Sequence, residues 1–297
     1  MSQQTIALPS AEAERSIGLW GDALRRMRRS PAAISGAVLV GLFVLMAIFA
    51  PFIATHDPIR GSLSDSYLPP FTGDHLFGTN IQGQDVFSRI IFGSRLTLGI
   101  AVMSVVIGVA IGAVFGAIAG YFRGWPDALI MRGVDIMLSI PGLLFAIGVV
   151  TFLGRGVVQI AVAIAIVNIP IFARLLRGSL LGLREADYVI AARSVGVGGG
   201  ALLVQHMLPN AIGPLIVQAT LALATAVVDA AALGFLGLGP PDPRTPEWGT
   251  MLSDTYRYLN SAVHLAFFPG IAIVLSVLGF NLLGDGMREA LDPKLRR

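Results

Sequence analysis

Six long apolar runs separate the polar segments of this chain, and they restrict its fold more than any other feature. They cover roughly residues 34–54, 95–120, 134–153, 157–176, 211–236 and 265–284. A helix needs about 20 mainly apolar residues to cross the core of a bilayer. The chain is 55% hydrophobic and only 13% charged, whereas soluble domains carry about 25% charged residues. The sequence therefore predicts an all-α polytopic membrane protein with six transmembrane helices.

The distribution of basic residues predicts the orientation of these helices. With the N-terminus inside, 15 of the 21 Lys and Arg residues fall in inner segments and 6 in outer segments. Lys and Arg concentrate in cytoplasmic loops, so we expect both termini to be cytoplasmic. The first run follows 33 largely polar residues, a longer lead than that of a cleavable signal peptide. We interpret this run as a retained anchor.

The outer segments differ in composition from the inner ones. Residues 55–94 are rich in Pro, Gly and Asp, which is typical of a loop with many turns. Residues 239–250, GPPDPRTPEWGT, contain four prolines and cannot form a span. We divide the chain into a cytoplasmic tail at 1–33, a first transmembrane anchor at 34–54, an extracytoplasmic loop at 55–94, a core of five spans at 95–287, and a cytoplasmic tail at 288–297.

Several kinds of catalytic site are excluded by the residue inventory. The chain has no cysteine, and its single lysine, Lys294, follows Pro293, so no glycine-rich loop leads into a phosphate-binding lysine. No two histidines have the spacing of a zinc-binding HExxH helix, and no serine lies in a G-x-S-x-G motif. The net charge of +3 follows from membrane topology and does not indicate a nucleic-acid partner. We expect no catalytic residue, bound cofactor or metal in this chain.

The most informative polar segment is EADYVIAARSVGVGGGALLVQHMLPN, residues 185–210. Its first part, 185–196, has the period of a short amphipathic helix. One face carries Tyr188, Ala191, Ala192 and Val195, and the other carries Asp187, Arg193 and Ser194. Gly196 and the glycines at 198–200 end the helix, since glycine accepts positive φ. This helix either lies at the lipid headgroups or docks a cytoplasmic partner.

The same segment resembles the cytoplasmic loop of ABC-transporter permeases. Their pattern is E-A-A, three residues, G, nine residues, I, one residue, then L-P. Here Ala191 and Ala192 are followed by three residues and then Gly196. Nine residues after Gly196 come His206, Met207, Leu208 and Pro209, so the spacing matches throughout. The family's Glu is Ile190 and its Ile is His206 in this chain. Both departures resemble the peptide-transporter subgroup and leave Arg193 as the charged contact.

Other segments extend the resemblance over nearly the whole chain. HLFGTNIQGQDVFSRIIFGSRLTL at 75–98, LGFLGLGPPDPRTPEWGTML at 233–252 and FNLLGDGMREALDPKLRR at 280–297 resemble segments of dipeptide and oligopeptide importers. The first span and the residues around it resemble the N-terminal region of the C-type subunits. The chain as a whole is therefore similar to permease subunits of peptide ABC importers.

This resemblance implies a type I ABC importer permease fold and transport of di- or oligopeptides across a bacterial cytoplasmic membrane by alternating access. The implied partners are a second, B-type permease, two ABC ATPase subunits or one double ATPase, an extracytoplasmic peptide-binding protein, membrane lipid and the peptide. ATP and Mg would bind the ATPases. A coupling loop at about 177–210 would contact an ATPase through Tyr188, Ala191, Ala192, Arg193, Gly196, Leu208 and Pro209. A permease for nickel or glutathione, or a stand-alone secondary transporter, remains an alternative.

Three further residues are candidates for contacts outside the coupling loop. A carboxylate at the bilayer centre costs roughly 2.5–3.5 kcal/mol, so Asp229 should face the bundle or water. It would either contact the peptide in the translocation pathway or pair with a polar group of the second permease. Pro241 and Trp248 are candidates for docking the binding protein, Trp248 being alternatively an interfacial anchor.

Glycines in the second apolar run indicate close helix packing. Gly108, Gly112, Gly116 and Gly120 lie at four-residue spacing, which brings them to one side of a helix. Small residues on one side let a second helix approach closely. The partner helix belongs either to this subunit or to the second permease.

Overall fold

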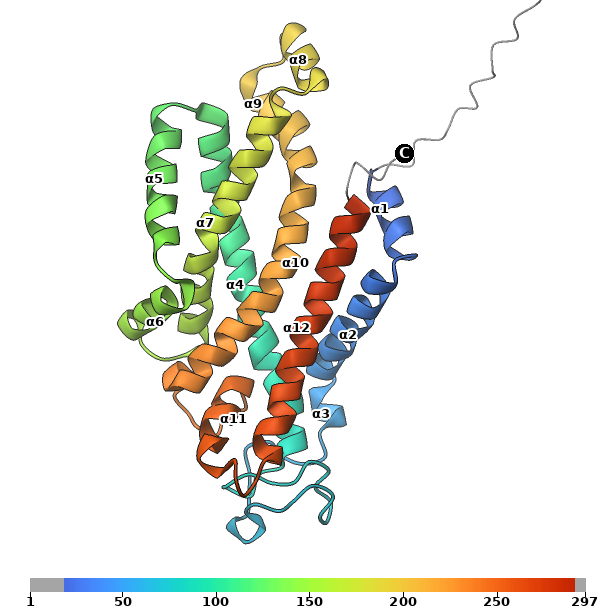
Figure 1. Ribbon diagram of the computed structural model, residues 1–297, viewed down its shortest axis with the longest axis vertical. Helices are drawn as coiled ribbons and strands as arrows, with labels where there is room; N and C mark the ends of the chain where they lie inside the picture. The colour runs from blue at the N-terminus through green and yellow to red at the C-terminus, as the bar shows by residue number, and fades with distance from the viewer. Residues whose placement is uncertain (1–18, 292–297) are drawn as a thin grey trace, which may run out of the picture.

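The computed structural model describes residues 19–291. Residues 1–18 and 292–297, which belong to the two predicted tails, lie outside the described residues. Five elements in this range are long and apolar enough to cross a membrane. They are α2 (Pro31–Ile48), α4 (Val86–Phe122), α7 (Val157–Leu183), the run Gly199–Leu238 that contains α10 (Leu208–Leu233), and α12 (His264–Leu291). They form an elongated bundle (Figure 1). The predicted helical membrane protein is confirmed.

The predicted third span, 134–153, is not one helix. The chain forms α5 (Trp125–Ser139) and α6 (Gly142–Leu153), which are bent by 96° at the break between them. Pro141 lacks an amide hydrogen and forces the preceding residue out of the helical region, and Ile140 is extended at φ −94°, ψ 130°. A sixth crossing exists only if the bent pair counts as one span, and α6 turns sideways in Figure 1.

Helices α4 and α7 approach each other closely along the glycines of α4. A Cβ on Gly112 would lie 2.7 Å from the Ile169 carbonyl oxygen, and one on Gly116 would lie 2.6 Å from that of Ala173. Small residues allow such close crossing of membrane helices. The glycine spacing therefore serves packing within the subunit, which decides between the two alternatives left open by the sequence.

The anchor helix α2 packs against α12 in the same way. Gly36 of α2 faces the backbone of Leu283, where a Cβ would collide with the amide nitrogen. From the other side, a Cβ on Gly286 would lie 2.5 Å from that of Ala33. The N-terminal anchor is thus packed onto the last span, so α2 and α12 lie side by side in the bundle (Figure 1).

The loop between the first two spans is shorter than expected. After α3 (Ala50–Ile53) it contains one short helix, η1 (Leu63–Asp65), and it ends at Val86, where α4 begins. Residues 86–94, expected in the loop, are helical because Asp85 caps α4: its Oδ2 accepts a hydrogen bond from the Ser88 amide at 2.8 Å.

Candidate functional site

Helix α8 (Asp187–Ser194) lies at the end of the bundle opposite the loop between α3 and α4 (Figure 1). The acidic Asp187 is in its first turn and the basic Arg193 in its last turn, which suits the helix dipole. Gly196 follows with φ +85°, a left-handed conformation that glycine adopts without strain. The helix and the glycine that ends it agree with the sequence pattern.

The burial of α8 divides its residues into an anchored side and a free side. Val189 is fully buried, while Ala186 and Ala192 are half-buried against the core. On the free side Tyr188 is 41% exposed and Val195 is 81% exposed. Ile190, Ala191 and Arg193 are also exposed.

One position of α8 differs from the expectation. The helical wheel placed Ala192 on the docking face with Tyr188 and Ala191, but the structure packs Ala192 against the core. The reason is that Val189, three residues earlier on the same side, is the buried anchor of the helix. Ala192 is therefore less exposed than Tyr188 and Ala191.

A polar contact connects α8 to the start of α10. The Tyr188 hydroxyl donates to the backbone carbonyl of His206 at 3.5 Å, and the Asn210 side-chain amide donates to the same oxygen at 2.7 Å. His206 belongs to η2 (Leu202–Met207), a π-helical turn that follows α9 (Gly199–Ala201) and leads into α10. Leu208 is half-buried and Pro209 is exposed in the first turn of α10. Both hydrogen bonds therefore meet at His206, two residues before the start of α10.

Asp229 lies in the second half of α10, on a side that the subunit leaves partly open. Thr225 and Val228 are exposed, and Asp229 itself is half-buried. Within residues 19–291, no side chain that the structure describes forms a hydrogen bond or an ion pair with Asp229. The carboxylate is therefore available to a group outside this chain.

At the opposite end of the bundle, the two candidate docking residues have different environments. Pro241 is exposed. Trp248 is fully buried, and its indole Nε1 donates to the Ile90 carbonyl at 3.0 Å. It can therefore be neither a docking residue nor an interfacial anchor. Its role is to pack α11 (Trp248–Thr255) onto α4.

Sequence reasoning missed the residue before it, Glu247, which is also fully buried. Its carboxylate caps α11 by accepting hydrogen bonds from the amides of Gly249 at 2.9 Å and Thr250 at 2.8 Å. Burial raises the pKa of Glu247, and these hydrogen bonds oppose that shift. An acidic residue just before a helix is a capping signal, so Glu247 could have indicated the start of α11. The sequence instead predicted a loop here because of the nearby prolines.

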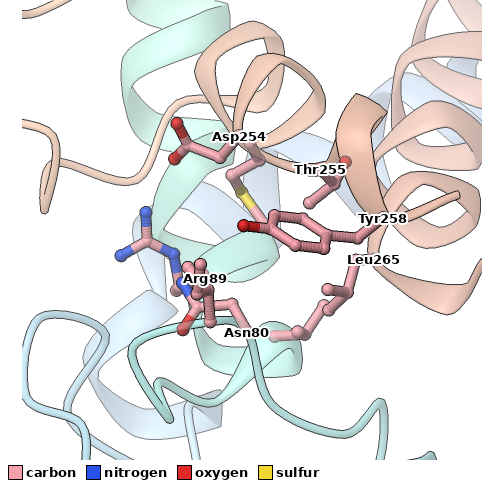
Figure 2. Close-up of a pocket in the computed structure, with 9 residues that line it drawn as sticks. Asn80, Arg89, Asp254, Thr255, Tyr258 and Leu265 are labelled. Atoms are coloured by element: carbon pink, nitrogen blue, oxygen red, sulfur yellow. The ribbon is translucent and has the colours of Figure 1, made fainter. Parts of the chain in front are cut away.

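A second missed residue, Arg89, joins the outer segments to one another. Its guanidinium is buried, and Nη1 donates to the Pro58 carbonyl, the Gln84 side chain and the Arg244 carbonyl at 3.0, 2.7 and 3.0 Å. Arg89 also lines a pocket with Asp254 and Tyr258 (Figure 2). These contacts connect the loop before α4 with the proline-rich segment before α11.

Comparison with known proteins identifies the family of the chain. Residues 112–297 match the family described as "Binding-protein-dependent transport system inner membrane component". Residues 18–70 match the "N-terminal TM domain of oligopeptide transport permease C".

Two relatives match over nearly the full length. The chain is 42% identical over 296 residues to the dipeptide transport system permease protein DppC of Alkalihalophilus pseudofirmus, a match that covers 100% of this chain and 97% of the relative. It is 42% identical over 290 residues to the glutathione transport system permease protein GsiD of Escherichia coli, covering 98% of this chain and 95% of the relative.

A solved structure has the same fold. Inward-facing MetNI, a methionine ABC transporter, matches with a TM-score of 0.58 at 20% identity, over 69% of this chain and 97% of the matched chain. At this identity the likeness is evidence for the fold alone. The family match at 112–297 covers most of the region 95–287 that was predicted to hold five spans. The chain belongs to the family of inner-membrane components of binding-protein-dependent transport systems, and it has the fold of a type I ABC importer permease.

Proposed function

We propose that this chain is one of two permease subunits of an ATP-driven importer that carries di- or oligopeptides across a bacterial cytoplasmic membrane. The observation that carries this proposal is α8, a helix anchored through Val189 whose other side is exposed at one end of the bundle. Tyr188, Ile190 and Val195 are exposed apolar or aromatic side chains close together on this segment, which suits a protein contact. The names of the relatives support the substrate class.

The excess of Lys and Arg at the α8 end supports a cytoplasmic location for this end and for both termini. The sequence offers no phosphate-binding loop, so ATP and Mg are assigned to partner ATPase subunits, either two chains or one double ATPase. One ATPase receives α8 through Tyr188, Ala191 and Arg193. Closure of the ATPases then moves α8, and the contact of Tyr188 with the His206 carbonyl transmits the movement to α10.

This movement switches the bundle between inward-facing and outward-facing states. Gly196, at φ +85°, is the point about which α8 turns relative to the following residues. A binding protein delivers the peptide to the outer loops, where Pro241 is exposed. Asp229 serves either the translocation pathway or the contact with the second, B-type permease.

A second substrate within the same class is glutathione, which the GsiD relative is named for. Glutathione is itself a small peptide, so the two assignments differ in the ligand delivered by the binding protein and share the same coupling. A nickel importer or a stand-alone secondary transporter has less support, since neither relative described above is named for such a function.

The test combines purification with transport. A tag on this chain should recover a second permease and ATPase subunits from membranes. Ala191→Trp fills the free side of α8 and should abolish labelled dipeptide uptake while leaving the thermal stability of the isolated chain unchanged. Ala37→Trp, on the exposed side of α2, is the matched control and should preserve uptake.

Two outcomes of this test change the conclusion. Purification without partners, together with normal uptake by Ala191→Trp, would overturn the proposal. Uptake that unlabelled glutathione competes for better than dipeptides do would select the second substrate.

A further inference from the structure

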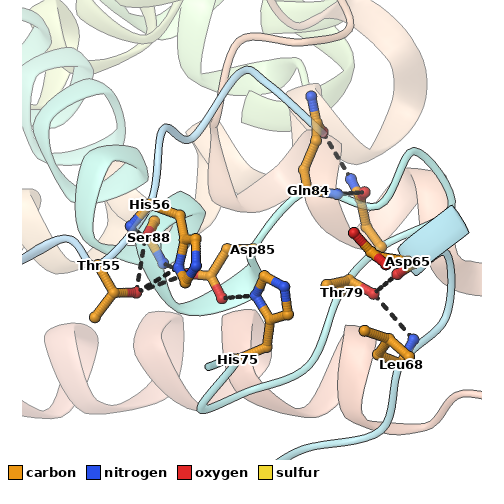
Figure 3. A network of polar contacts seen from close by, with 10 residues as sticks. Thr55, His56, Asp65, Leu68, His75, Thr79, Gln84, Asp85 and Ser88 are labelled. Atoms are coloured by element: carbon orange, nitrogen blue, oxygen red, sulfur yellow. Dashed lines mark hydrogen bonds and ion pairs between the residues drawn. The ribbon is translucent and has the colours of Figure 1, made fainter. Parts of the chain in front are cut away.

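Three side chains with metal-ligating atoms meet at the end of the bundle opposite α8. His56 follows α3, His75 lies in the loop, and Asp85 caps α4 (Figure 3). Their ligand atoms all lie within 4.8 Å of one another. The Nδ1 atom of His75 is 2.9 Å from Asp85 Oδ1, and that of His56 is 3.9 Å from Asp85 Oδ2. This cluster is separate from the coupling segment and from Asp229.

The backbone around each of the three residues holds it in place. The His56 amide donates to Ser88 Oγ at 3.0 Å, and the Ser88 amide donates to Asp85 Oδ2 at 2.8 Å. The His75 amide donates to the Thr72 carbonyl at 3.2 Å, and the His75 carbonyl accepts from the Phe71 amide at 3.0 Å. These contacts hold the segments that carry the ligands in place, and the bond from the Ser88 amide also orients the Asp85 carboxylate before a metal arrives.

We propose that His56, His75 and Asp85 form a binding site for a divalent transition-metal ion of the Zn²⁺ type. Two imidazoles and one carboxylate are a ligand set that Zn²⁺ accepts, with bonds of about 2.0–2.2 Å and a fourth position left for water. Bonds of that length require small rotations that bring the His56 ring nearer to Asp85. The metal then replaces the hydrogen bond between His75 Nδ1 and Asp85 and the one between His56 Nδ1 and the Thr55 hydroxyl, and each ring binds through the Nδ1 lone pair with its hydrogen on Nε2.

Access to the site is compatible with binding from solution. The side chain of His56 is 34% exposed and that of His75 is 15% exposed, whereas the side chain of Asp85 is fully buried. The two ring centroids lie 4.5 Å apart, and the Nδ1 atoms of both rings lie within 3.9 Å of the same carboxylate. Two partly exposed imidazoles over one buried carboxylate leave the solvent side open to the ion and its remaining water.

The ion would cross-link three segments that are separate in the sequence: the end of the anchor, the loop and the start of α4. No metal was expected from the sequence, because no two histidines are spaced along one helix and these ligands come together only through the loop fold. An ion that binds the folded chain alone stabilises it by mass action. A bound ion would therefore stabilise the contacts between α3, the loop and the start of α4. It would not contribute to the translocation pathway.

The test uses the full-length chain in detergent, freed of metal by a chelator and titrated with Zn²⁺ alone. We expect one Zn²⁺ per chain by calorimetry, a rise in the unfolding temperature that the chelator reverses, and visible absorption bands when Co²⁺ is used as the probe. His75→Gln and His56→Gln should each weaken Zn²⁺ binding by about 100-fold or more, since loss of even an outer-shell partner costs about 10–100-fold.

One control variant tests whether Zn²⁺ binding is specific to this cluster. His206→Gln removes a histidine at the opposite end of the bundle and should keep the wild-type stoichiometry and affinity for Zn²⁺. Asp85 is not substituted, because it also caps α4. Absence of Zn²⁺ binding by the wild-type chain, or binding that His56→Gln and His75→Gln leave unchanged, would overturn the proposal. Neither outcome depends on peptide transport, so the metal site and the proposed function fail separately.

Discussion

The indole Nε1 of Trp248 donates a hydrogen bond to the backbone carbonyl of Ile90, 3.0 Å away and 158 positions earlier in the chain. The ring fits beside Gly93, where a Cβ would come within 2.9 Å of Trp248 Cδ1. Its other neighbours include Phe43, whose ring centroid is 5.7 Å away. This one side chain therefore joins α11, α4 and the anchor helix α2.

Truncating this side chain should destabilise the subunit. Trp248→Ala leaves a large cavity where the native ring is fully buried, and Trp-to-Ala changes in cores cost about 3–5 kcal/mol. Trp248→Phe keeps an aromatic ring and loses mainly the hydrogen bond, a cost of about 0.5–1.5 kcal/mol. Thermal unfolding of the purified chain should rank wild type, Phe and Ala in that order. Pro241→Ala, at an exposed position, should match the wild type, and a Trp248→Ala variant as stable as the wild type would contradict the assigned packing.

The crossing of α4 and α7 should tolerate no added side chain at its glycines. In Gly116→Val, the new Cβ would lie 2.6 Å from the Ala173 carbonyl oxygen and 3.0 Å from Leu176 Cβ. Overpacking of this kind costs about 1–3 kcal/mol. Gly99→Val on the same helix meets nothing within 4 Å and is the control. Melting temperatures of the two variants in detergent should differ, with only Gly116→Val lowered.

An ion pair connects α5, the first helix of the bent pair α5 and α6, to α7. Arg177 Nε and Nη2 donate to the two oxygens of Asp127 at 2.5 and 2.7 Å, a two-point contact between α5 and α7. Asp127→Arg places two cations together and should lower stability and yield. Exchange of both residues, Asp127→Arg with Arg177→Asp, should recover a large part of the loss. A double variant no better than the worse single variant would show that the pair does not hold α5 in place.

Elements specified by neighbouring residues were predictable from the sequence. Helix α8 has its charges and its glycine within one short segment, and the predicted spans at 157–176 and 265–284 lie within single helices. Hydropathy found the apolar run at 134–153, but because it measures composition it does not register that the run is divided into α5 and α6, bent by 96° at Pro141. The spacing of the glycines in α4 indicated close packing, but only the structure identifies α7 as the partner.

The features that the sequence could not predict depend on contacts between distant segments. Trp248 was expected at the surface, since it follows a proline-rich outer segment, and its burial depends on space left by Gly93. The grouping of His56, His75 and Asp85 depends on the path of a loop that has no periodic pattern. In the segment 185–210, a helical wheel places Ala192 beside Tyr188, and only the structure shows that Ala192 is half-buried against the core.

The open side of α10 provides a prediction about assembly. Asp229 has no partner among the side chains that the structure describes, and a charged group in a span is normally paired. We expect Asp229→Asn to reduce the amount of second permease that co-purifies with this chain. Thr225→Val, on the same side of the helix, should leave that amount unchanged. If assembly is normal and the KM for peptide uptake rises instead, the residue belongs to the pathway.

The turn after α8 provides the most direct test of the coupling mechanism. Gly196 has φ +85° and a Cβ there would meet nothing within 4 Å, so within this subunit a substitution acts through backbone strain and not through a clash. Gly196→Val should cost about 1–2 kcal/mol in this conformation, and a loss of that size lowers the population of the docked arrangement by about 5–30-fold. Gly196→Asn should be milder, since Asn tolerates positive φ. Peptide uptake at constant protein level should therefore fall in the order wild type, Asn, Val.

Gly198 is the matched position for this series, because it also has free space around it but lies at φ −62°, ψ 147°. A Val side chain is unstrained in that region, so Gly198→Val should transport like the wild type. Equal losses at 196 and 198 would mean that side-chain bulk at the ATPase contact, and not the left-handed turn, limits coupling. An unchanged rate in Gly196→Val would mean that α8 transmits its movement through the Tyr188–His206 contact without needing this backbone conformation.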